Sequence, residues 1–100
     1  MSSLKKYLLE GLNGSSTELT GDDEIFRLVV IAEADTVNFY QQLAKRAKNE
    51  ATRIMLLDIA KEEKVHMYEA MDHLELVDSE TNEVKNQAKE ETEELLKKSK

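Results

Sequence analysis

An all-α fold is predicted for this 100-residue chain, and three observations support the prediction. The chain has no proline and its three glycines lie at positions 11, 14 and 21, so no strong helix breaker occurs from Asp22 to Lys100. Apolar residues recur at helical spacing through two long segments. The length allows one small domain at most. We therefore expect a two-helix antiparallel hairpin over residues 22–76, followed by a C-terminal helix.

The composition excludes several classes of function. Asp and Glu number 21 against 14 Lys and Arg, a formal net charge of -7, so phosphate backbones repel the chain and nucleic acid is not an expected partner. The absence of cysteine excludes disulfides, thiolate metal sites and a thiol nucleophile. No apolar run reaches membrane-spanning length, and the apolar stretch in "MSSLKKYLLEGLNGSS" is too short for a secretory signal. We expect a soluble, cytoplasmic protein that contacts no membrane.

Residues 1–21 form an N-terminal lead that we expect to be flexible, because "NGSSTELTG" is rich in turn-forming residues. The first long helix is predicted to begin near Asp22, after an arrangement of Thr20 and Asp23 that resembles a capping box. It runs to about Lys48, where "KRAK" places positive charge at the C-terminal pole. Its segment "IFRLVVIA" is apolar on nearly all sides. A lone hairpin cannot cover that surface, so self-association is expected.

The second long helix is predicted to follow a tight turn, with Asn49 as N-cap, and to run to about Leu76. Each long helix has roughly 25 residues and a length of about 38 Å. Residues 77–100 hold a third, mostly charged segment with few apolar anchors, which Asp78 or Ser79 would cap. Three interpretations of it stay open: a solvent-facing helix, a strut against a partner, and a frayed tail.

Polar side chains occur inside the apolar faces of both long helices. Glu33 lies in the apolar row of the first helix, and Tyr40, seven residues later, lies over the same face. Glu63 and His66 are three residues apart and share one face of the second helix. Burying an ionised carboxylate without a partner is costly. A metal cation would compensate the charge, and hard oxygen donors with one imidazole suit iron, manganese or zinc.

This set of ligands predicts an assembly of two chains. Di-iron carboxylate bundles take one Glu from each of two helices and a Glu-x-x-His from each of the other two. The chain has one helix of each kind and therefore half of the set. Two copies would form a four-helix ferritin-like bundle around two metal ions. Four carboxylates would then balance the charge of two divalent cations.

Each of these features also has an ordinary structural explanation. A Glu-x-x-His in a Glu-rich helix is more often part of a solvated face than a ligand pair. A glutamate on an apolar face usually lies at the edge of a core, and a tyrosine there is usually a core residue whose hydroxyl reaches the rim. Their conjunction on two adjacent long helices favours the metal interpretation.

The segments "IAEADTVNFYQQLAKRA" and "LLDIAKEEKVHMYEAMDHL" resemble the encapsulated ferritins, the two-helix branch of the ferritin-like superfamily, and especially the archaeal type that is fused to an encapsulin shell protein. The resemblance covers roughly Asp22 to Leu76. It implies that hairpins dimerise to complete a di-iron ferroxidase centre with two Fe per subunit pair, and that dimers form a ring, typically a decamer. It further implies that the ring oxidises Fe(II) to Fe(III) with dioxygen inside an encapsulin nanocompartment, where the iron is stored.

The resemblance also implies a role for each candidate residue. Glu33 corresponds to the first-helix iron ligand, Glu63 to the carboxylate that bridges the two irons, and His66 to a terminal imidazole ligand. Tyr40 corresponds to a tyrosine beside the centre. Asp35 is the one acidic residue that remains of an accessory metal site found in some members.

Two other functions are compatible with the sequence. One is a different dimetal enzyme with the same class of ligands, either a rubrerythrin-like peroxidase or a manganese-type protein, and other divalent metals can take the place of iron. Rubrerythrin proper adds a four-cysteine iron site, which a chain without cysteine cannot form. The other is a non-catalytic helical oligomer whose polar residues set the register of packing.

Overall fold

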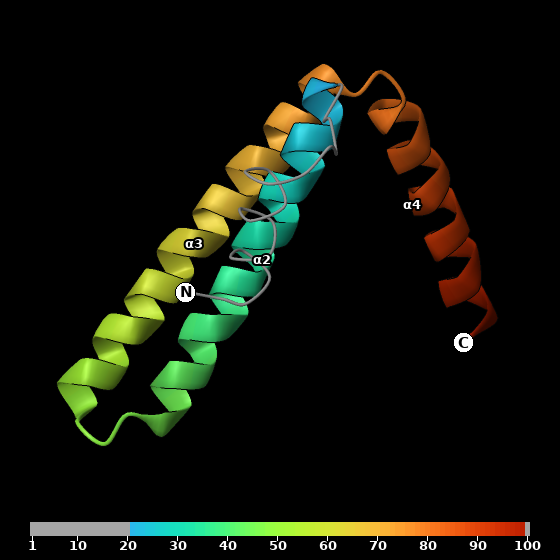
Figure 1. The fold of residues 1–100 in the computed structure, drawn as a ribbon. Helices are drawn as coiled ribbons and strands as arrows, with labels where there is room; N and C mark the ends of the chain where they lie inside the picture. The colour runs from blue at the N-terminus through green and yellow to red at the C-terminus, as the bar shows by residue number, and fades with distance from the viewer. Residues whose placement is uncertain (1–20, 100) are drawn as a thin grey trace.

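The computed structural model describes residues 21–99, and every regular element in that range is a helix, which confirms the all-α prediction (Figure 1). The elements are α2 (Asp22–Arg46), α3 (Glu50–Val77) and α4 (Thr81–Lys98). The predictions for residues 1–20, including a cap by Thr20, lie outside the described residues. Within them, no helix combines the length and the apolar character that crossing a membrane requires.

Helices α2 and α3 lie antiparallel and side by side as the predicted hairpin (Figure 1). Asn49 is the N-cap of α3, as predicted, and its Oδ1 accepts a hydrogen bond from the backbone N–H of Thr52 at 3.1 Å. The first helix ends at Arg46, slightly before the predicted Lys48, because Ala47 takes up extended backbone (φ -66°, ψ 132°). The backbone dihedrals of Ala47 therefore set the end of the helix. The side chains at this point are still those of residues that form helices.

Small side chains form the seam between α2 and α3. The buried apolar residues are Val37, Ala44, Ala60 and Ala70. Because alanine has no atoms beyond Cβ, the two backbones approach closely along this seam. Among the described residues no large side chain is fully buried, and many large apolar side chains stay exposed. This surplus of apolar surface agrees with the expected self-association, while the four-helix bundle of two chains stays a prediction.

Helix α4 differs from the other two because none of its residues is buried. It diverges from the hairpin after a sharp elbow (Figure 1). Two ion pairs hold this elbow: Arg27 with Asp78 at 3.4 Å and Lys85 with Glu75 at 2.6 Å. The base of α4 is therefore tied to one end of the hairpin, and the rest of the helix extends into solvent.

The predicted cap of the third helix was wrong. The residue at the N-cap position is Glu80, not Asp78 or Ser79, and it makes no side-chain capping bond. Asp78 acts one step earlier, since its Oδ1 accepts a hydrogen bond from the backbone N–H of Glu80 at 3.1 Å. Its side chain therefore stabilises the elbow instead of the first turn of the helix.

Candidate metal centre

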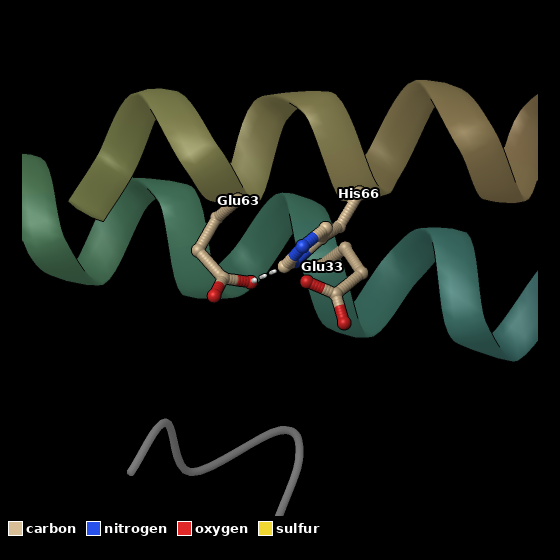
Figure 2. A group of neighbouring side chains, drawn as sticks. All are labelled: Glu33, Glu63 and His66. Carbon is tan, nitrogen blue, oxygen red and sulfur yellow. Dashed lines mark ion pairs between the residues drawn. The ribbon is translucent and has the colours of Figure 1, made fainter. Parts of the chain in front are cut away.

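Glu33, Glu63 and His66 meet on one side of the hairpin (Figure 2). Glu33 comes from α2, and the other two lie one turn apart on α3. One ligand atom from each residue lies within 4.8 Å of the ligand atoms of the other two. Nδ1 of His66 is 3.8 Å from Oε2 of Glu63. The antiparallel packing of α2 against α3 therefore gathers the three residues that the sequence singled out, and we call them the trio.

The members of the trio differ in burial. Glu33 and Glu63 are half-buried, and Oε2 of Glu33 is fully covered. The side chain of His66 is 53% exposed, compared with 21% for Glu63. Two carboxylates within reach of one imidazole form an anionic cluster, which a cation would neutralise. Carboxylate oxygen and imidazole nitrogen are ligands that suit iron, manganese and zinc. The residues present therefore fit a divalent metal ion.

An open groove continues from the trio along the hairpin. Glu33 and His66 line it together with Glu69 and His73. The ring of His73 packs against the ring of Phe26, with their centroids 4.3 Å apart. Glu69 and His73 lie three and seven residues after His66, a spacing that places them on the same side of the helix. The groove leaves His66 accessible from solvent.

The other two predicted site residues have different surroundings. The ring of Tyr40 packs edge-on against Phe39, with centroids 5.5 Å apart. Asp35 is two residues after Glu33 and points to a different side of α2. It is not part of the trio. Its Oδ2 is buried and forms no hydrogen bond with the described residues. The roles expected of Tyr40 and Asp35 stay predictions.

Comparison with known proteins gives one informative match. Over 48 residues, the chain is 50% identical to a protein of Pyrococcus furiosus described as a ferritin-like-encapsulin shell fusion protein. The match covers 48% of this chain and 14% of that protein, so the chain spans a small part of the relative. No protein-family model matches the chain, and no solved structure gives a significant match. The match confirms the resemblance to the encapsulated ferritins that the two motifs predicted.

Proposed function

We propose that this chain, which resembles the encapsulated ferritins, is a ferroxidase that oxidises Fe(II) to Fe(III) with dioxygen at a di-iron centre shared by two copies. The convergence of Glu33, Glu63 and His66 from two helices, within 4.8 Å of one another, carries this proposal. Iron is the substrate. Two Fe(II) ions held side by side give up one electron each, so the pair can reduce one dioxygen to hydrogen peroxide when two protons are taken up.

The proposed sharing between two copies follows from the charge and the exposure of the trio. One chain offers two carboxylates and one imidazole, fewer ligands than two metal ions need. His66 is exposed and the adjoining groove is open, so a second chain has access to the site. A two-fold axis through the site would double the set to four carboxylates and two imidazoles. The charge of the carboxylates would then match that of two Fe(II) ions.

Within this centre each residue has a distinct task. The resemblance to the encapsulated ferritins assigns Glu63 as the carboxylate that would contact both ions. Glu33 and His66 would each bind one ion. Hard carboxylate oxygens stabilise the higher oxidation state of iron and so favour the oxidised product. We retain Tyr40 as a residue that supports the centre and Asp35 as part of an accessory metal site.

The proposed cellular context rests on the relative, which is described as a fusion with an encapsulin shell. We propose that dimers of this chain form a ring, with ten subunits as the expected size, in the cytoplasm inside an encapsulin compartment that stores the oxidised iron. In the proposed division of the chain, residues 22–76 form the ferritin-like unit, residues 1–21 a lead and residues 77–100 a charged extension.

The test combines native mass spectrometry with oxygen consumption. Protein loaded with Fe(II) under anaerobic conditions should carry two irons per two chains and should consume oxygen when air is admitted. Glu63→Ala and His66→Ala should lose both properties. The matched control is Glu62→Ala, at the neighbouring exposed position. Normal oxidation rates in both trio variants would refute the assignment.

The same experiment separates the alternative functions. Tight binding of Mn(II), with no oxygen consumption on addition of Fe(II), would point to a manganese-type or rubrerythrin-like dimetal protein. A stable oligomer that takes up no metal would point to a helical scaffold, in which the trio only sets the register of packing.

A further inference from the structure

The groove beside the trio differs in charge from other grooves on the hairpin. Within residues 21–99 its lining consists of two carboxylates, two imidazoles and three apolar side chains, with no lysine or arginine. Two grooves elsewhere on the hairpin each have a lysine in the lining, Lys45 in one and Lys64 in the other. Because a concave surface lined by negative charge concentrates cations, the groove beside the trio is the one that attracts metal ions.

This groove extends over two turns of each helix. Glu33 and His66 lie at one end of it, and Phe26 and His73 lie at the other. Both pairs of positions are seven residues apart along their helices, which corresponds to about 10 Å. Glu69 lies between the two histidines of α3, three residues after one and four before the other. The end of the groove away from the trio therefore has its own carboxylate and its own imidazole.

Glu69 and His73 are well placed to bind one ion together. Residues four positions apart are neighbours on a helix surface, and this is the separation of the two zinc-binding histidines in helices with the motif H-E-x-x-H. The ring of Phe26 packs against the ring of His73 and restricts its orientation. Glu69 forms no hydrogen bond or ion pair with any residue from 21 to 99, so its carboxylate is available to a ligand.

The groove has room for a hydrated ion at this position. Its volume is about 360 Å³. A water molecule occupies about 30 Å³ in the liquid, so a metal ion with several bound waters fits. One carboxylate and one imidazole suit Fe(II), Co(II) and Zn(II). Two protein ligands hold an ion less firmly than the three of the trio, and an ion bound there would exchange readily.

We propose that Glu69 and His73 form a second binding site for a divalent metal ion, with water completing the coordination. This site and the trio open into the same groove. Fe(II) that dissociates from the second site is therefore released about 10 Å from the trio and is more often captured there than Fe(II) from bulk solvent. This supply of iron rests on the proposed ferroxidase function, whereas the second site itself does not.

Co(II) titration tests the second site in full-length chains that lack the trio. Glu33→Gln with Glu63→Gln removes the charge of the trio, and circular dichroism checks that this background stays helical. It should bind one Co(II) per chain. Adding Glu69→Gln or His73→Gln should weaken that binding at least about tenfold. Asp72→Asn is the matched control, because it removes the same charge as Glu69→Gln at the exposed position next to His73, and it should bind as the background does.

Two results of this titration would overturn the proposal. One is a background that binds no Co(II). The other is Co(II) affinity that is the same in the Glu69→Gln, His73→Gln and Asp72→Asn chains, which would place the ion elsewhere.

An introduced thiol locates the ion directly. The chain has no cysteine, so a thiolate bound to Co(II) gives an absorption band in the near ultraviolet that no other residue of the chain produces. His73→Cys in the same background should show this band when Co(II) is added. Asp72→Cys, whose side chain lies about 100° away around the helix, should not. A band in neither variant, or in both, would refute a site at Glu69 and His73.

Oxidation kinetics test the supply of iron in chains that retain the trio. Glu69→Gln should raise the Fe(II) concentration for half-maximal oxidation about threefold, and Asp72→Asn should leave it unchanged. Equal values in the two variants would refute the supply of iron from the second site. If the wild type oxidises no Fe(II), the proposed ferroxidase function fails, and the Co(II) experiments still decide whether the second site exists.

Discussion

The α2–α3 hairpin and α4 are both regular helical structures, yet different forces stabilise them. The hairpin buries Val37 and three alanines along one seam, whereas α4 buries no residue. Helix α4 depends on the intrinsic helix propensity of its Glu, Lys, Ala and Leu residues and on the two ion pairs at the elbow. Propensity is enough to make a helix. Packing is needed to hold two helices in register.

This difference explains where the candidate chemistry lies. The trio draws ligands from two helices, so its geometry depends on the seam between them. Helix α4 has several glutamates, but they share one exposed helix with no packed neighbour across from them. Carboxylates therefore gather into a candidate metal site on the hairpin, whereas those of α4 lie on a solvated surface.

The largest expected contrast is in metal binding. Glu33→Ala removes the one ligand of the trio that α2 supplies and should weaken Fe(II) binding at least about tenfold. Glu93→Ala, at an exposed position on α4, should leave binding unchanged. Anaerobic equilibrium titration measures both affinities. Equal affinities in the two variants would mean that the hairpin holds no metal through Glu33.

The next contrast is in packing. Ala60→Leu places extra methyl groups in the seam, where Ala60 is only 2% exposed, and should lower the free energy of unfolding by about 1–3 kcal/mol. Ala88→Leu makes the same substitution on the exposed α4 and should change that free energy by less than about 0.5 kcal/mol. Urea denaturation of dilute protein followed by circular dichroism supplies both values. An unchanged free energy of unfolding in the Ala60→Leu variant would show that the seam is less tightly packed than the burial of Ala60 indicates.

A smaller contrast is expected at the helix starts. Asn49→Ala removes the bond from Oδ1 to the N–H of Thr52 and should lower the free energy of unfolding by about 1 kcal/mol. Glu80→Ala removes no capping bond, since Glu80 makes none. Its effect should stay below about 0.5 kcal/mol. The same denaturation experiment checks both, and similar losses would show that α4 also depends on its N-cap residue.

The smallest expected effect is on pH dependence. The hydrogen bonds from Arg27 and Arg53 hold the pKa values of the Asp23 and Glu50 carboxyls below their ordinary values. A lowered pKa contributes stability above the pKa of the unfolded chain, and this stability is lost as the pH falls through the folded pKa. Both pairs are exposed, so the loss should be slight.

Melting temperatures test this point between about pH 5 and about pH 3, the range in which carboxyls with lowered pKa values titrate. Asp23→Asn and Glu50→Gln should each flatten the acid side of the profile relative to the wild type. Profiles that coincide with that of the wild type would mean that these two ion pairs of the hairpin contribute nothing in solution.

Much of the fold could be predicted because helix signals are local. The absence of proline and of interior glycine, the apolar periodicity and Asn49 at the N-cap position are all readable from neighbouring residues. The errors fell at helix ends. Near Lys48 and Ser79 the local residues are compatible with more than one boundary, and the backbone of the connection decided where each helix stopped or started.

The helices and the face on which each polar residue lies follow from local sequence, because 3.6 residues per turn relate position to direction. Local sequence thereby placed Glu63 and His66 together. The packing of the two helices against each other brings Glu33 to them and places Lys45 in one groove with Arg53. These contacts depend on the register of α2 against α3. The close packing of small side chains along the seam sets that register. Such a register is a property of two surfaces in contact, and no single stretch of sequence contains it.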